Sequence, residues 1–242
     1  MEKFKKILIY NPMRNLVLIR HGESVYNKEK IFCGWTDVEL SEKGKEEAHN
    51  AGRLLKREGY SFDMAFTSVL KRAINTLNIV LGEMNEENIP IEYSWRLNER
   101  HYGALQGLKH EQMTKEYGAE QVHSWRRSYK VKPPQLELND SRYPGNDEKY
   151  GNLDKNDIPR GESLEDTVER VLPYWNEEIM PKILKGKKVV VSASGNSLRA
   201  LIKHIDGMSD EEIIGLEIKT GAPLIYELED NSLKSIRHYY LE

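Results

Sequence analysis

The chain has 242 residues, and its 36 Lys and Arg against 39 Asp and Glu give a formal net charge of −3. Acidic and basic residues are interspersed, which argues against a broad basic face for nucleic acid or anionic membranes, so any anion site is expected to be local. One cysteine, Cys33, cannot form an internal disulfide, and no apolar run is long enough to span a bilayer. We therefore expect one cytoplasmic domain with no nucleic-acid partner and no membrane partner.

The first hundred residues alternate between strand and helix patterns. A continuous apolar run over Leu16–Ile19 is typical of a strand that is buried on both faces. Ser41 is expected to begin a helix and Gly59 to end it, and a second helix is expected to end at Gly82. In chain order the predicted elements are a strand over 16–19, a helix over 41–59, a strand over 63–68, a helix over 70–82 and a strand over 89–93.

The rest of the chain continues this alternation after an irregular stretch. Residues 95–108 are polar, contain glycine and lack periodicity, which indicates a functional loop. Ser163 with Asp166, and Ser209 with Glu212, resemble capping boxes. The further predicted elements are short helices over 111–129, a surface insertion over 133–159, a long helix over 163–183, a strand over 187–193, a helix over 197–204 and a hairpin of 224–228 with 235–240. This order predicts a single α/β domain whose central sheet is mainly parallel, with helices on both faces.

Arg20, His21 and Gly22 follow the first predicted strand directly. In open α/β sheets, ligands bind outside the carboxyl ends of the strands, so this position favours a site. A neutral imidazole is a good nucleophile, and an adjacent arginine can hold a phosphoryl group through bidentate hydrogen bonds. For an isolated His-Gly pair, a histidine satisfied in a turn is the commoner interpretation.

The stretch LVLIRHGES, from Leu16 to Ser24, resembles the signature of the histidine phosphatase superfamily. Within that superfamily, six more stretches are similar to the bisphosphoglycerate-dependent phosphoglycerate mutases: FCGWTDVELSEKG (32–44), TSVLKRA (67–73), WRLNERHYGALQGL (95–108), WRRSY (125–129), ESLEDTVERVLPYWNEEI (162–179) and GNSLRAL (195–201). The similarity runs over residues 15–241. We therefore expect a phosphoglycerate mutase-like domain over 15–242 and an N-terminal extension over 1–14.

The resemblance implies an isomerase of glycolysis and gluconeogenesis that interconverts 2-phosphoglycerate and 3-phosphoglycerate. His21 would accept and return the phosphoryl group once 2,3-bisphosphoglycerate has primed the enzyme, and Glu99 would donate and accept the proton. Arg20, Arg72 and Asn27 would hold the phosphoryl group beside His21. The resemblance also implies no metal, small phosphorylated three-carbon acids as partners, and a homo-oligomer that is a dimer or a tetramer.

Further residues are implied to bind the rest of the substrate. By resemblance, Arg126, Arg127 and Tyr102 would fix the second anionic end, although two adjacent helical arginines more often form a solvated face. The resemblance assigns four more positions to the pocket, where Cys33 and Gly34 would form part of the lining and Gly195 and Asn196 would supply backbone and amide donors. The turn from a strand into a helix at Gly195 suits anions on its own account.

Two positions depart from the family pattern. Ser194 stands where the family has a second histidine, and a serine hydroxyl is shorter than imidazole and cannot become cationic. Leu108-Lys109-His110 stands where the family has Asn then Lys, so the substrate-binding lysine is either shifted to Lys109 or replaced by His110. Both departures predict a weaker grip on the ligand or on the transition state.

Two alternative functions use the same pocket. A phosphatase would release the phosphoryl group to water, so it would act on bisphosphoglycerate or another phosphomonoester. A catalytically silent homologue would only bind phosphorylated ligands, and Ser194 is the main sequence feature in its favour. The presence of His21 and Glu99 together with the arginines argues against a silent protein.

Overall fold

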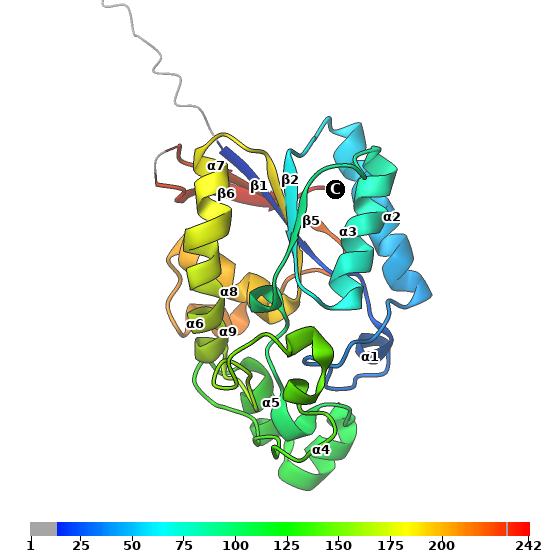
Figure 1. Cartoon of the computed structure of the whole chain (residues 1–242), viewed down its shortest axis with the longest axis vertical. Helices are drawn as coiled ribbons and strands as arrows, with labels where there is room; N and C mark the ends of the chain where they lie inside the picture. Colours follow the sequence, from blue (N-terminus) through cyan, green and yellow to red (C-terminus); the bar gives the residue numbers. More distant parts are fainter. Residues whose placement is uncertain (1–13, 231) are drawn as a thin grey trace, which may run out of the picture.

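A single six-stranded sheet organises the part of the chain that the computed structural model describes, residues 14–230 and 232–242 (Figure 1). Its strands are β1 (Arg14–Arg20), β2 (Met64–Thr67), β3 (Ile91–Tyr93), β4 (Val189–Ala193), β5 (Pro223–Leu228) and β6 (Ser235–Tyr240). They lie in the order β3-β2-β4-β1-β5-β6. The first four are parallel, whereas β5 runs antiparallel to both β1 and β6. The expected α/β class and mainly parallel sheet are confirmed, and so is the hairpin of β5 and β6.

Helices cover both faces of this sheet, as the buried apolar strand at Leu16–Ile19 predicts (Figure 1). The helices that pack on the sheet are α2 (Glu42–Arg57), α3 (Lys71–Met84), α6 (Leu164–Tyr174), α7 (Met180–Leu184) and α8 (Gly195–Asp206). Val17 and Ile19 of β1 belong to a core with α2 and α3, whereas Leu16 and Leu18 belong to a core with α6, α7 and α8. Because successive side chains of a strand point to opposite faces, β1 is buried against both helix layers.

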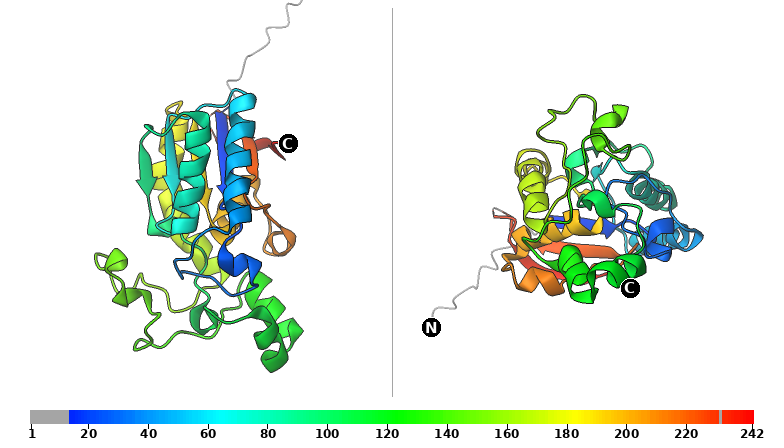
Figure 2. Two further views of the ribbon diagram at one scale, coloured as in Figure 1. Left: turned by 90° about the vertical axis from the view of Figure 1, so that its right-hand side faces the viewer. Right: turned by 90° about the horizontal axis from the view of Figure 1, so that it is seen from below.

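The shorter elements gather beyond one end of the sheet, where Figure 2 shows the segment from about residue 100 to 160 projecting away from it. The short α-helices are α1 (Val25–Lys28), α4 (His110–Tyr117), α5 (Ala119–Arg127) and α9 (Glu212–Gly215). Single 3₁₀ turns span Trp95–Leu97, Gly103–Leu105, Pro144–Asn146 and Glu148–Tyr150. The irregular character expected for 95–108 and 133–159 is thus confirmed. The insertion is not wholly superficial, however, because Leu136, Tyr150 and Ile158 are buried.

Some predicted boundaries differ from the structure. The helix expected to end at Gly82 runs on to Met84 and ends at Asn85, whose φ of 60° is left-handed. Burial of Met84 in the core outweighs the modest cost of a helical glycine, which is about 1 kcal/mol. The helix expected over 197–204 begins earlier, at Gly195.

The long helix after Ser163 is continuous but not regular. The expected Ser163–Asp166 capping box begins this helix. The second expected capping box, later in the chain, is also seen as a reciprocal pair of hydrogen bonds between Ser209 and Glu212. Residues Trp175–Ile179 form a π-helical turn between α6 and α7. That turn separates two prolines, Pro173 and Pro181, each of which removes a backbone donor from the helix.

The N-terminal extension expected over 1–14 lies outside the described residues, apart from Arg14. Arg14 is the first residue of β1, and its guanidinium forms an ion pair with Asp230.

The turn after β1 depends on two glycines that touch. A Cβ on Gly22 would lie 2.2 Å from the carbonyl oxygen of Gly44 in the first turn of α2. A Cβ on Gly44 would in turn lie 2.0 Å from the carbonyl oxygen of Glu23. This close approach of two backbones places the first turn of α2 against Gly22, the residue after His21.

We expect Gly44→Ala to lower the free energy of unfolding by about 1–3 kcal/mol, because the added methyl group overpacks this contact. Gly215→Ala is the matched control, since a Cβ there meets no atom within 4 Å. Urea denaturation of both variants checks the prediction. A Gly44→Ala protein as stable as the unsubstituted chain would show that the contact tolerates a side chain.

Candidate active site

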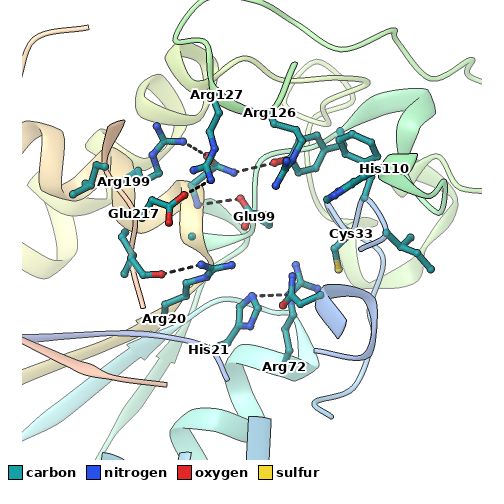
Figure 3. Close-up of a pocket in the computed structure, with 18 residues that line it drawn as sticks. Arg20, His21, Cys33, Arg72, Glu99, His110, Arg126, Arg127, Arg199 and Glu217 are labelled. Carbon is teal, nitrogen blue, oxygen red and sulfur yellow. Dashed lines mark hydrogen bonds and ion pairs between the residues drawn. The ribbon is translucent and has the colours of Figure 1, made fainter. Parts of the chain in front are cut away.

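A pocket of about 270 Å³ opens beyond the carboxyl ends of β1 and β4 (Figure 3). Of the residues expected to form the site, those that line it are Arg20, His21, Asn27, Cys33, Arg72, Glu99, Tyr102, Arg126, Arg127, Gly195 and Asn196. Gly34 does not line it but contributes a carbonyl to one of its arginines. The structure therefore brings together segments that are far apart in the sequence.

His21 is buried at the end of β1, with 2 % of its surface exposed. Its Nδ1 lies 2.8 Å from the carbonyl oxygen of Gly22, so this nitrogen carries the hydrogen. The lone pair of Nε2 accepts a hydrogen bond of 3.1 Å from Nε of Arg72. Burial, with the charges of Arg72 and Arg20, lowers the pKa of His21 well below its usual value. The ring is therefore neutral near pH 7, with its nucleophilic nitrogen turned toward an arginine.

Arg72 is fully buried in α3 and connects His21 to the loop between α1 and α2. Besides the bond to His21, its Nη1 donates to the carbonyl of Thr36 at 2.9 Å and its Nη2 to that of Gly34 at 2.7 Å. Gly34 has a φ of 52°, and a Cβ there would lie 2.0 Å from Oε1 of Gln106. A glycine is thus needed where the loop bends around the guanidinium.

Arg20 offers an unused donor on the other side of His21. Its Nη1 donates to the carbonyl of Ile218 at 2.8 Å, while its buried Nε has no partner among the described residues. The same Nε would lie 3.3 Å from a Cβ on Gly195, at the first turn of α8. A buried cationic donor beside a helix N-terminus is well placed for an anionic ligand.

Glu99 faces the same cavity as Arg20, His21 and Arg72 (Figure 3). Its Oε1 accepts hydrogen bonds from the backbone N–H groups of Arg100, at 2.8 Å, and Asn196, at 3.1 Å. Because these bonds hold one oxygen, the orientation of the other is also fixed. The carboxyl group can therefore exchange a proton with a ligand in the cavity.

Two smaller side chains complete the wall near His21. Oδ1 of Asn27 accepts from the N–H and the hydroxyl of Ser24, which leaves its amide nitrogen as a donor. Burial raises the pKa of the Cys33 thiol, and its Sγ lies 3.7 Å from the carbonyl oxygen of Thr36. Cys33 thus lines the pocket as an uncharged group.

Cations form a second group at the far side of the pocket, on α5 and α8 (Figure 3). Arg126 and Arg127 end α5, and Tyr102 lines the same pocket, with its hydroxyl 3.4 Å from Nδ2 of Asn196. The five lining arginines are Arg20, Arg72, Arg126, Arg127 and Arg199, against two lining carboxylates, those of Glu99 and Glu217. In a chain of net charge −3, this concentration of cations is a candidate anion site of the local kind that the composition predicts.

Sequence reasoning missed Arg199 and Glu217. Arg199 lies one helical turn after Asn196 and donates to its Oδ1 at 3.1 Å, so helical spacing could have revealed it. Burial and neighbouring arginines lower the pKa of Arg199 to about 10, which leaves it charged near neutral pH. Glu217 comes from the loop after α9 and forms an ion pair of 2.6 Å with Arg127. No periodic pattern marks that loop.

The structure also distinguishes the two readings of Lys109-His110. Lys109 precedes α4 and does not line the pocket, whereas His110 does, with its ring centroid 4.3 Å from that of Phe32. Burial and the charges of Arg126 and Lys30 lower the pKa of His110 to about 4. Near neutral pH His110 therefore offers a hydrogen bond and not a charge.

Ser194 lies directly before α8 and is completely buried. Its hydroxyl has no hydrogen-bond partner among the described residues, although it occupies the N-cap position, where serine usually accepts from the helix. Ser194 does not itself line the pocket. Its two neighbours have defined places: Ala193 ends β4, and Gly195 lines the pocket.

The sequence matches a known protein family and a curated relative. A family model of the histidine phosphatase superfamily (branch 1) matches residues 16–143 and 139–240. The chain belongs to the histidine phosphatase superfamily. A curated relative from Hamiltonella defensa, named 2,3-bisphosphoglycerate-dependent phosphoglycerate mutase, is 55% identical over 229 residues, which cover 95% of this chain and 92% of the relative. The family membership inferred from the sequence motifs is confirmed.

Solved structures share the fold of this superfamily member. A phosphoglycerate mutase from Bacillus anthracis superposes with a TM-score of 0.64 at 21% identity, over 93% of this chain and 92% of that chain. A mycobacterial glucosyl-3-phosphoglycerate phosphatase superposes with a TM-score of 0.67 at 22% identity, over 94% and 97%. At these identities the likeness concerns the fold alone.

Within residues 14–230 and 232–242, no helix combines the length and the apolar character that crossing a membrane requires. No group of three or more His, Cys, Asp or Glu side chains in the same ranges is arranged to hold a metal ion.

The Glu217–Arg127 pair predicts that a carboxylate of the protein competes with an anionic ligand. Glu217→Gln should lower the Kd for 3-phosphoglycerate about two- to fivefold, since an exposed ion pair is worth about 0.2–1 kcal/mol. Glu211→Gln removes the same charge from an exposed residue outside the pocket and should leave the Kd unchanged. Isothermal titration calorimetry measures both. Equal affinities in the two variants would refute competition at Arg127.

Proposed function

We propose that this chain interconverts 2-phosphoglycerate and 3-phosphoglycerate through a phosphohistidine at His21. The observation that carries the proposal is a neutral, buried imidazole whose unprotonated nitrogen adjoins a pocket rich in arginine. The name of the relative from Hamiltonella defensa supports the same reaction. A hydrolase would also need a phosphohistidine, but nothing in the described pocket favours hydrolysis over return of the phosphoryl group.

The separation of the arginines into two groups suits a substrate with two anionic ends. Arg20 and Arg72 flank His21 and would hold the phosphoryl group in line with Nε2. Arg126 and Arg127 at the far side would bind the carboxylate, with the neutral His110 beside them. A three-carbon acid phosphate is short enough to lie between two such groups in a pocket of about 270 Å³.

In the proposed chemistry His21 and Glu99 act on opposite sides of one phosphoryl transfer. In the primed enzyme the free hydroxyl of 3-phosphoglycerate attacks the phosphorus of phosphorylated His21 and loses its proton to Glu99, the bond from phosphorus to Nε2 breaks, and 2,3-bisphosphoglycerate forms. The Nε2 lone pair then attacks the other phosphorus of this intermediate, the bond from that phosphorus to the substrate oxygen breaks, and the oxygen takes the proton from Glu99 to give 2-phosphoglycerate. In the unphosphorylated protein Nε of Arg72 donates to Nε2, and this donor becomes free for the phosphoryl oxygens when Nε2 is phosphorylated.

The same residues fit 2,3-bisphosphoglycerate, which would supply the phosphoryl group that first charges His21. The fit rests on buried donors that lack partners among the described residues, namely Nε of Arg20 and Nε of Arg199. Each could be satisfied by an anionic oxygen. A cytoplasmic location, a dimeric or tetrameric assembly and the absence of a metal remain predictions.

The test of this function is labelling at His21 together with turnover. Incubation with 2,3-bisphosphoglycerate should add one acid-labile phosphoryl group, seen by intact-mass spectrometry, and His21→Ala should abolish it. Mutase turnover should require the primer and exceed release of free phosphate. Labelling that persists in His21→Ala would reject this nucleophile, and phosphate release faster than mutase turnover would favour a phosphatase.

Ser194 leads to a quantitative prediction about the rate. If a histidine there stabilises charge that develops during transfer, its absence lowers kcat by a factor on the order of 10²–10³. Binding of the substrate should change much less, because Arg20 and Arg72 remain in place. We therefore expect a slow mutase.

Ser194→His should raise kcat by that factor with little change in KM. Ser194→Ala is the matched control and should leave kcat within about twofold, because the serine hydroxyl has no hydrogen-bond partner in residues 14–230 and 232–242. Thermal melting verifies that both variants fold. Equal rates for Ser194→His and the unsubstituted chain would contradict the prediction, and a large loss in Ser194→Ala would assign the work to the serine itself.

A further inference from the structure

Glu99 lies on backbone that has no regular hydrogen bonding of its own. The segment Asn98–Tyr102 is neither helix nor strand and lies between two single 3₁₀ turns. A residue that must deliver a proton to one atom needs a fixed backbone, since a displacement of about 1 Å can cost about 10²-fold in rate. The contacts that hold this segment come from elsewhere in the chain.

Arg170 of α6 binds the carbonyl side of the segment. Its side chain is 6% exposed and points from α6 into a row of backbone oxygens. Its guanidinium donates to the carbonyls of Trp95 (3.3 Å), Arg96 (2.7 Å), Asn98 (3.2 Å) and Glu99 (3.3 Å). One planar cation thus binds the backbone carbonyls of the segment that leads to Glu99 and of Glu99 itself.

Glu162 binds the amide side of the same segment. Its side chain is 5% exposed, and it forms two hydrogen bonds with Arg170, of 2.7 and 2.9 Å. Its Oε2 also accepts from the N–H of His101 at 2.7 Å, and its own N–H donates to the carbonyl of His101 at 2.8 Å. The ion pair therefore holds the backbone on both sides of Glu99.

We infer that Glu162 and Arg170 are positioning residues for Glu99, an inference that rests on the proposed function. Neither side chain lines the pocket, so neither contacts the reacting atoms. A buried ion pair is weak evidence for stability, because apolar residues of similar size often stabilise a fold as well. The hydrogen bonds from this ion pair to the Glu99 segment give the pair a role in positioning that stability alone would not require. Lysine could not replace Arg170, because a single ammonium lacks the planar fork that reaches several carbonyls.

The experiment compares Arg170→Lys and Glu162→Gln with the unsubstituted enzyme by steady-state kinetics. Both should lower kcat about 10- to 100-fold and leave KM within about threefold, because Arg126 and Arg127 still bind the substrate. Phosphorylation of His21 by the primer should still go to completion. The control is Glu227→Gln, which breaks the two-bond pair with Arg237 on the β5–β6 hairpin and should leave kcat unchanged.

A double-variant comparison separates positioning from a general loss of structure. In the Glu99→Gln background, Arg170→Lys should cost no further turnover, because the residue that it positions no longer transfers a proton. Multiplicative losses, or a rise in KM with unchanged kcat, would overturn the inference. Should Arg170→Lys melt below the assay temperature, Glu162→Gln carries the same comparison, since it preserves shape and loses only charge. Full activity of Glu99→Gln would instead refute the proton-transfer role in the proposed function, and it would leave no activity for a positioning residue to protect.

Discussion

The candidate active site is built around one neutral imidazole that lies between two permanent cations. Burial and the charges of Arg72 and Arg20 act together on His21, and each disfavours a second proton on the ring. The carbonyl of Gly22 takes the hydrogen of Nδ1, so the lone pair stays on the nitrogen that faces Arg72. The same cations that suppress protonation are the groups that would attract a phosphoryl dianion. The two arginines would thereby both keep His21 unprotonated and bind the anionic ligand.

The rest of the pocket moderates a strongly positive field. Five lining arginines are offset by Glu99 and by Glu217, which pairs with Arg127. His110 adds no further charge, because burial lowers its pKa to about 4. A site of this kind binds multiply charged anions yet must also release them within each turnover. The proposed mutase reaction, in which substrate and product have the same charge, requires that balance.

Much of this could be predicted from sequence because the signals are local. The apolar run before His21 indicates a strand end, and the motifs at residues 67–73, 95–108 and 195–201 supply residues that line the same pocket as that histidine. What could not be predicted arises from tertiary packing. Glu217 reaches the pocket from a loop without periodicity, and the bonds from Arg170 to four carbonyls depend on how α6 lies against the irregular segment that carries Glu99. The helix end misassigned to Gly82 has the same cause, since the burial of Met84 decides it.

The protonation state of His21 can be measured directly by NMR of the ¹⁵N-labelled protein. Long-range ¹H–¹⁵N spectra distinguish the two neutral tautomers and the imidazolium, and His21→Ala assigns the resonances. We expect a neutral ring with hydrogen on Nδ1 at pH 6.5, where an ordinary histidine is about half protonated. Because the pKa in the folded protein is lowered, this spectrum should not change between pH 6.5 and 8. A half-protonated ring at pH 6.5, or hydrogen on Nε2, would contradict it.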